Sequence, residues 1–138
     1  MTLSAATIAI LYISTFAVFL ALDYLGLSYL IKPTFERFIP DLILDSPRLG
    51  PALMFYSFYI VGVLWFVSMP AMTGDKSLLW VFGTAAFLGA LGYGTYEFTN
   101  LSVMKDWNWT MTLTDFFWGI ALTGTAATAG VAITRSIG

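Results

Sequence analysis

The chain of 138 residues contains no cysteine and no histidine. The lack of cysteine excludes disulfide bonds and thiolate chemistry. The lack of histidine removes the usual side chain that ligates haem, zinc, copper or a chlorophyll-type pigment, and it removes the usual general base near neutral pH. We therefore expect no metal site and no ligated cofactor, although bound lipids are expected. The same absences favour a non-catalytic protein over an enzyme.

Charged residues are also scarce, at 10% of the chain, whereas a soluble domain has about 25%. Hydrophobic residues make up 59%, aromatic residues 17%, and the mean hydropathy is +0.83. A water-facing surface needs more charge than this. The composition predicts an all-α integral membrane protein, a four-transmembrane-helix bundle. With a net charge of −2, nothing suggests a nucleic-acid partner, and the lipid bilayer is the expected surrounding.

Four apolar stretches are long enough to cross a bilayer, which takes about 20 helical residues. We predict one domain over residues 1–138, with helices at about 3–31, 51–70, 77–104 and 110–134. The connection 32–50 holds three prolines, three basic and three acidic residues, which would interrupt a spanning helix. It is either a short segment along the membrane interface or an ordered loop packed on the bundle. Pro70 is expected to end the second helix.

Four spans place both termini on one side of the membrane. The side with the long connection carries four basic residues, and the other side carries two and the terminal amine: Lys32, Arg37, Arg48 and Lys105 against Lys76 and Arg135. The positive-inside rule then puts the long connection in the cytoplasm and the termini outside, in the periplasm of a bacterium. We expect the first helix to stay uncleaved, because no basic segment precedes it and no cleavage site follows it.

The fourth helix is rich in glycine, alanine and threonine, and Ala126 and Gly130 have the small-xxx-small spacing of close helix contacts. The third helix offers a matching set of small residues. The expected packing positions are Gly89, Gly92, Gly119, Gly124, Ala126 and Gly130. This surface predicts either a tight hairpin within the chain or a docking face for another membrane protein. Trp107 and Trp109 are expected to anchor the intervening turn at the membrane interface.

Polar side chains form a predicted layer near the long connection. Its candidate members are Asp23, Tyr93, Tyr96, Glu97, Asn100 and Asp115. Asp115 fits a helix-start carboxylate, because Thr112 and Asp115 have capping-box spacing. Asp23 and Glu97 lie in the C-terminal halves of their helices and must be protonated, share a proton, reach a basic residue at the interface or bind a cation. The layer is either a hydrogen-bonded lock between helices or a ligand or proton site.

Several motifs resemble a bacterial family of small membrane proteins known as domain of unknown function 2177. The most specific lie in the third and fourth helices and the turn between them: Tyr93-Gly-Thr-Tyr96, Thr99-Asn-Leu101, Trp107, Asp115 and Trp118-Gly119. The second helix contributes Ala52, Tyr56, Tyr59, Gly62, Phe66 and Pro70-Ala71, and the first contributes Asp23 and Leu25-Gly26. The family usually has tryptophan where this chain has Tyr24. The resemblance implies a four-helix protein of a bacterial inner or intracytoplasmic membrane, and no activity.

Three functions are compatible with these features, in the following order. The first is a non-catalytic accessory or scaffold subunit that packs against other integral membrane proteins and stabilises a larger complex, for example a respiratory or photosynthetic assembly. The alternative is a lipid-handling enzyme or carrier that uses the buried carboxylates. The third is proton or cation translocation, for which the opposite halves of the helices lack carboxylates and basic groups.

Overall fold

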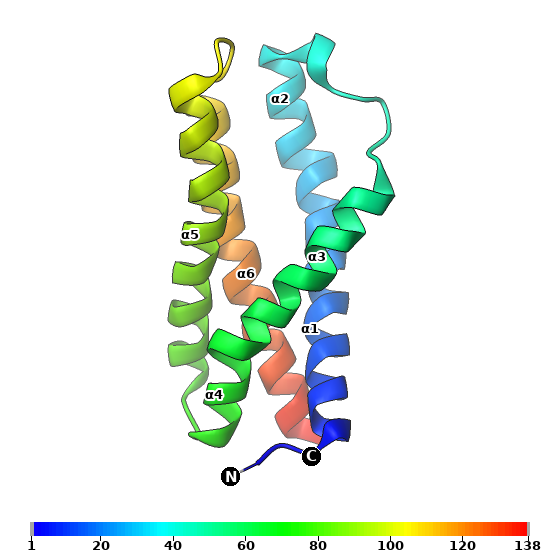
Figure 1. The fold of residues 1–138 in the computed structure, drawn as a ribbon, viewed down its shortest axis with the longest axis vertical. Helices are drawn as coiled ribbons and strands as arrows, with labels where there is room; N and C mark the ends of the chain where they lie inside the picture. The colour runs from blue at the N-terminus through cyan, green and yellow to red at the C-terminus, as the bar shows by residue number, and fades with distance from the viewer. Residues whose placement is uncertain (1, 138) are drawn as a thin grey trace.

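The structure is a computed structural model that describes residues 2–137; Met1 and Gly138, the ends of the predicted domain, lie outside this range. Within it, four helical spans are long and apolar enough to cross a membrane, and no strand is present. Both ends of the chain lie at the same end of the bundle (Figure 1). The predicted all-α four-helix membrane fold is confirmed.

The first span is longer than predicted. It consists of α1 (Ala5–Gly26), a π-helical turn η1 (Leu27–Ile31) and α2 (Lys32–Phe38). The predicted end at residue 31 is therefore wrong. Pro33 has no N–H, and its ring would clash with the carbonyl four residues earlier in an α-helix. The wider turn just before it removes that conflict, and the N–H of Lys32 donates to the carbonyl of Leu27 five residues back.

The second span repeats the same arrangement. It consists of α3 (Leu49–Val63), a π-helical turn η3 (Leu64–Ser68) and α4 (Met69–Thr73). Pro70 was expected to end this helix, but the helix passes through it for one more turn. In both spans the proline is the second residue after a five-residue π-helical turn. Each span can therefore bend at its π turn without a break in the helix.

The connection between these spans is shorter than the predicted 32–50, because α2 occupies its first part. A single 3₁₀ turn, η2 (Pro40–Leu42), lies within it. Phe35 and Ile39 are buried against Met111 in a small apolar cluster. Within the connection, Ile39 packs on the end of the bundle, whereas Leu42 and Leu44 are exposed, so the connection has features of both a packed loop and a segment along the membrane interface.

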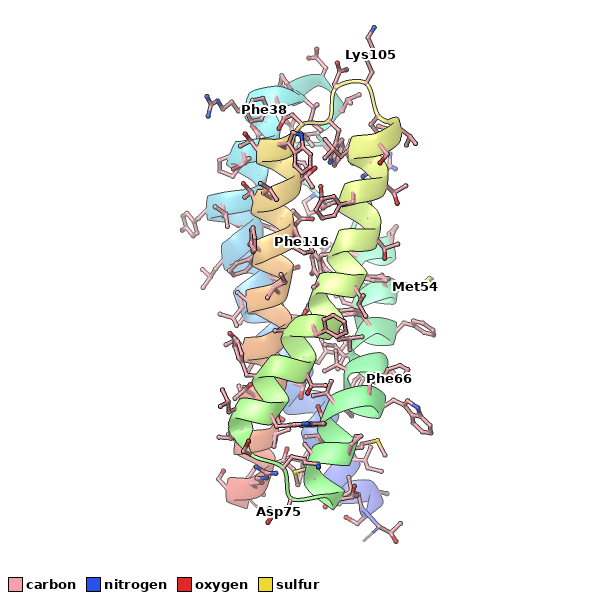
Figure 2. The ribbon with its side chains drawn as sticks, turned by 90° about the vertical axis from the view of Figure 1, so that its left-hand side faces the viewer. Phe38, Met54, Phe66, Asp75, Lys105 and Phe116 are labelled. Atoms are coloured by element: carbon pink, nitrogen blue, oxygen red, sulfur yellow. The ribbon has the colours of Figure 1, made fainter. Side chains whose placement is uncertain are left out.

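The remaining spans are α5 (Leu78–Val103) and α6 (Trp109–Ile137). The helix α6 packs against both α5 and α1, while α3 crosses the front of the bundle diagonally (Figure 1). Figure 2 shows Asp75 and Lys105 at opposite ends of the molecule, with Met54 and Phe66 projecting outward from the second span. Charged ends and an apolar belt are the arrangement expected for a multi-pass membrane protein.

The small residues of α6 are in close contact with neighbouring helices. Three glycines each lie under a side chain from another helix: Gly119 under Tyr93, Gly124 under Phe82 and Gly130 under Thr15. A methyl group added at Gly89 would lie 2.6 Å from the carbonyl oxygen of Gly119, and Ala126 is buried in the main core. Gly92 differs from the other predicted packing positions, because it faces the Tyr59 ring of α3.

Candidate functional site

A cavity of about 690 Å³ lies between α1, η1, α2, α3, α5 and α6. It occupies the upper part of the view in Figure 1, where α3 runs away from α5. Leu27, Phe55 and Tyr96 line it and are exposed. Because these residues lie well within their helical spans, the cavity opens sideways through the apolar belt.

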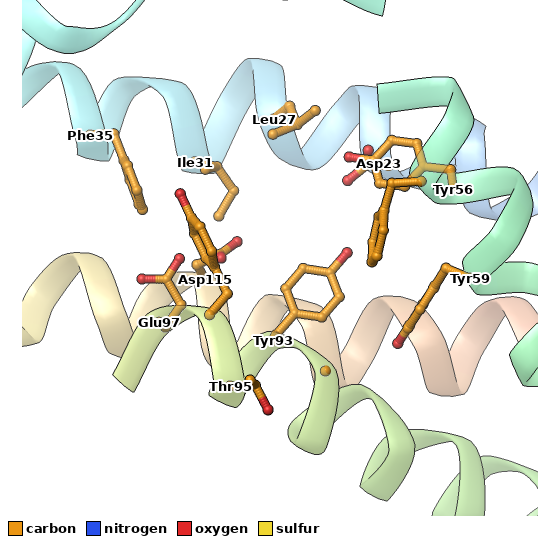
Figure 3. Close-up of a pocket in the computed structure, with 13 residues that line it drawn as sticks. Asp23, Leu27, Ile31, Phe35, Tyr56, Tyr59, Tyr93, Thr95, Glu97 and Asp115 are labelled. Carbon is orange, nitrogen blue, oxygen red and sulfur yellow. The ribbon is translucent and has the colours of Figure 1, made fainter. Parts of the chain in front are cut away.

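Glu97 is the most deeply buried polar group of this cavity. Its side chain is 0% exposed, and its Oε1 accepts a hydrogen bond of 2.9 Å from the indole Nε1 of Trp107. Its Oε2 has no donor among the described residues. The carboxyl of Asp115 lies next to Glu97 at the same end of the cavity (Figure 3).

The position of Asp115 corrects its predicted role at the start of a helix. The helix α6 begins at Trp109, and Asn108 caps it: the Asn108 carbonyl accepts from the backbone N–H of Thr112, and its side chain accepts from that of Met111 at 2.9 Å. Asp115 is the seventh residue of α6, beyond the first turn. The predicted capping box is therefore wrong, and Asp115 belongs to the cavity.

Trp107 was expected to anchor the turn in the interface, but its side chain points into the bundle. Its ring packs edge-on against Phe35 at 5.4 Å and against Tyr96 at 6.1 Å, between centroids. Its N–H is the donor to Glu97, and this bond explains the inward orientation, because a buried carboxyl oxygen without a partner is costly. Trp109 is 62% exposed, as an interfacial side chain would be.

Asp23 forms a second acidic point in the same cavity. It is 4% exposed and lies beside Tyr56 and Trp118, whose indole Nε1 has no hydrogen-bond partner among the described residues. Figure 3 shows Asp23 next to Tyr56, apart from Glu97 and Asp115. Within residues 2–137, no group of three or more metal-ligating side chains is close enough to hold a metal ion.

Aromatic rings surround the Asp23 end of the cavity. The Phe55 and Tyr59 rings stack at 5.6 Å between centroids, and the Tyr59 ring meets the Tyr93 ring edge-on at 6.3 Å. Tyr93 lies between the two acidic points, with its hydroxyl toward the first span (Figure 3). The Tyr59 hydroxyl is 2.9 Å from Thr123 Oγ1, which joins α3 to α6.

Two of the predicted layer residues do not lie in the interior of the cavity. Tyr96 lies on the exposed rim, and Asn100 lies beside Tyr96 and does not line the cavity. Sequence reasoning missed the contribution of the second span, Tyr56 and Tyr59. Their spacing of three residues places them on one helix face, which was the available signal. It was not distinctive, because aromatic residues are common along the whole of that span.

No curated protein and no solved structure matches this chain. A family model described as a predicted membrane protein, domain of unknown function 2177, matches residues 8–132. The match covers all four spans, the cavity and both of its acidic points. The chain therefore belongs to the membrane-protein family known as domain of unknown function 2177.

Proposed function

We propose that this protein binds a membrane amphiphile, with its polar headgroup in the acidic cavity and its apolar tail in the sideways opening. The observation that carries this proposal is Glu97 Oε2, a fully buried acceptor without a donor that lines a cavity of about 690 Å³. Mostly apolar cavities of this size with a few convergent polar groups are the usual form of small-molecule sites. The protein is then a lipid-binding or lipid-carrying protein, and a ligated cofactor is no part of the proposal.

A purely structural lock accounts for less of the geometry. A lock of hydrogen bonds between helices satisfies its polar atoms and leaves no large space, because protein interiors are close-packed. Here the Trp107–Glu97 hydrogen bond acts as such a lock within the α5–α6 hairpin. The space beyond it and the free oxygen of Glu97 are left over. A bound ligand fills this space, and the buried carboxyl of Glu97 adds negative potential to it.

One of the supports for the role of accessory subunit is weaker. The small-residue face of α6, considered as a docking surface, is covered by α1 and α5 at Gly119, Gly124 and Gly130. The outward surface consists largely of bulky apolar side chains, which suit lipid chains as well as another protein. Transport across the whole membrane has little support, because residues 5–22, 55–73, 78–90 and 119–134 contain no charged side chain.

The distribution of basic residues indicates from which leaflet of the membrane the amphiphile would come. The basic residues favour a cytoplasmic position for the loop between the first two spans. Because the cavity lies near that loop, the amphiphile would come from the cytoplasmic leaflet of the bacterial inner membrane. The periplasmic position of the termini is part of the same proposal.

Native mass spectrometry of the protein extracted from its own membrane tests the proposal. The cavity-filling variant is Gly92→Leu: a Cβ at Gly92 would lie 3.4 Å from the Tyr59 ring, an ordinary contact, so the rest of the new side chain would enter the cavity. The matched control is Gly83→Leu on the same helix, where an added Cβ has no described atom within 4 Å.

We expect a lipid-sized adduct, at one copy per chain, on the natural protein and on Gly83→Leu, and its loss from Gly92→Leu. An adduct that survives Gly92→Leu unchanged would contradict the proposal. If the protein instead runs in native electrophoresis as part of a larger complex that is unaffected by Gly92→Leu, the accessory role replaces it.

A further inference from the structure

The cavity is acidic, and the protein supplies no positive charge to neutralise it. Asp23, Glu97 and Asp115 line it, and none of its lining residues is basic. The nearest basic residue along the first span is Lys32, which is exposed and engaged elsewhere. Its Nζ lies 3.7 Å from Glu36 and donates to the backbone carbonyl of Asp45 at 3.0 Å. A cationic group on the ligand would therefore complement the carboxyl groups of the cavity, which no basic lining residue does.

Three carboxyl groups and several tyrosine hydroxyls supply the polar atoms of the cavity. The Trp107 N–H is used by Glu97, and the Tyr59 hydroxyl is engaged by Thr123. Glu97 Oε2 has no hydrogen-bond partner among the described residues. An anionic headgroup would be repelled by the three carboxyl groups, whereas a cationic headgroup would be attracted. A neutral sugar headgroup can bond to the tyrosine hydroxyls, which both donate and accept, but it would leave the carboxyl groups without an opposite charge.

The rings around Asp23 suit a cation in a second way. Tyr56, Tyr59, Tyr93 and Phe55 line the same end of the cavity as Asp23. Aromatic faces attract organic ammonium ions through the ring quadrupole, and several rings with a nearby carboxylate form the usual cage for such ions. This observation is independent of the unpaired oxygen of Glu97, which lies at the other end.

We propose that the ligand of this cavity is an amphiphile with an organic ammonium headgroup, which Asp23 and the rings of Phe55, Tyr56, Tyr59 and Tyr93 hold within the bilayer. This inference rests on the proposed amphiphile binding and assigns its chemical class. The headgroup lies between α1, α3 and α5, and the tail leaves between η1 and α5, past Leu27 and Tyr96. The carboxyl pair lies farther along the same cavity, where it adds negative potential.

Three probes with the same tail and different headgroups test the inference. They are dodecyltrimethylammonium, dodecyl sulfate and dodecyl maltoside, titrated one at a time into the full-length protein in a neutral polyoxyethylene detergent. Native mass spectrometry counts the adducts and gives an apparent affinity for each. We expect one saturable site for the ammonium probe, with the sulfate and maltoside probes weaker by about tenfold or more.

Substitutions of Asp23 and Tyr56 distinguish the contribution of the carboxylate charge to ammonium binding from the contribution of the aromatic rings. Asp23→Asn keeps the size of the side chain and removes its charge, so the ammonium probe should bind about tenfold more weakly or worse, while the other two probes should change little. Tyr56→Phe keeps the aromatic face and should bind the ammonium probe nearly as well as the natural protein. Tyr56→Leu loses that face and should weaken binding by about threefold or more.

The outcomes distinguish failure of this inference from failure of the proposed function. Equal binding of all three probes, lost together in Gly92→Leu, would overturn the ammonium headgroup and leave amphiphile binding in place. Binding of all probes that is insensitive to Gly92→Leu would remove the proposed function itself. If Asp23→Asn unfolds, as circular dichroism would reveal, the pair Tyr56→Phe and Tyr56→Leu decides: equal binding by both would overturn the inference.

Discussion

The two ends of the bundle bury polar atoms in different ways. At the end that carries the termini, the hydroxyls of Thr128 and Thr134 donate to carbonyls of their own helix, each at 2.7 Å, and the helices meet at glycines. At the other end, Asp23, Glu97 and Asp115 surround a cavity. The first end buries only hydroxyl groups, two of which, on Thr15 and Ser68, have no hydrogen-bond partner among the described residues. The second end buries carboxyl groups, which line a cavity.

This difference suggests that the termini end serves mainly the stability of the bundle and the cavity end serves mainly its function. Close packing at the termini end stabilises the bundle through van der Waals contact, which is the main association force between helices in a membrane. Buried carboxyls are costly in a membrane and are usually found where they serve a purpose. Substitutions at the packed end should therefore change stability, and substitutions at the cavity end should change binding.

The largest effect on stability is expected for Gly89→Ala. Its new Cβ would lie 2.6 Å from the backbone carbonyl oxygen of Gly119 and 2.8 Å from Thr123 Oγ1. Backbone cannot move aside as a flexible side chain can, so α5 and α6 must separate, at a cost of about 3 kcal/mol. Thermal unfolding in detergent, followed by circular dichroism, measures the loss.

Gly83→Ala is the matched control for this packing prediction. It lies on the same helix with open space around its Cα, so alanine should stabilise by about 0.5–1 kcal/mol through helix propensity. Equal stability of the two variants would show that the contact between α5 and α6 is not tight.

Trp107→Phe should have the next largest effect, because it removes one donor from the cavity end. Phenylalanine keeps a ring against Phe35 and Tyr96 but loses the N–H that donates to Glu97. A buried carboxyl oxygen left without its partner costs about 2 kcal/mol. Chemical unfolding in mixed micelles measures this loss, and Trp109→Phe, at an exposed ring, should change it little. If Trp107→Phe leaves the free energy of unfolding unchanged, the hydrogen bond to Glu97 does not contribute to stability.

Tyr59→Phe should have a smaller effect on stability. The variant loses the hydrogen bond to Thr123 that joins α3 to α6, worth about 1 kcal/mol. The ring stays in the cavity, so affinity for the ammonium probe should hold. A double-mutant cycle with Thr123→Val isolates the pair, and coupling near zero would contradict the bond.

Glu97→Gln should have the smallest effect on stability of these variants. It therefore tests whether a residue at the cavity end can change binding without changing stability. The amide oxygen can still accept from Trp107, and the amide N–H₂ can donate to Asp115, so unfolding should shift by less than about 0.5 kcal/mol. Binding of the ammonium probe should weaken, because the variant removes one of the three carboxyl groups that line the cavity. If Glu97→Gln lowers stability and leaves binding unchanged, the cavity end contributes to stability and not to binding, which would contradict this comparison.

Composition alone predicted the membrane fold, the four spans and the shared side of the termini, because a bilayer imposes its length and polarity on each helix. The span ends at Pro33 and Pro70 were missed, because a proline normally ends a helix and the π turns that accommodate it leave no distinctive pattern in the sequence. Asp115 was misplaced by a capping pattern that Asn108 already satisfies. Trp107 was misread because its inward turn depends on a carboxyl ten residues earlier in the chain.

The most direct test of amphiphile binding is a crystal structure of the protein purified with its native lipids and grown from a lipidic phase. We predict one elongated density in the cavity, with its polar end between Asp23 and Tyr93 and its tail leaving between η1 and α5. A cavity that is closed by side chains, or that holds water alone, would contradict the account.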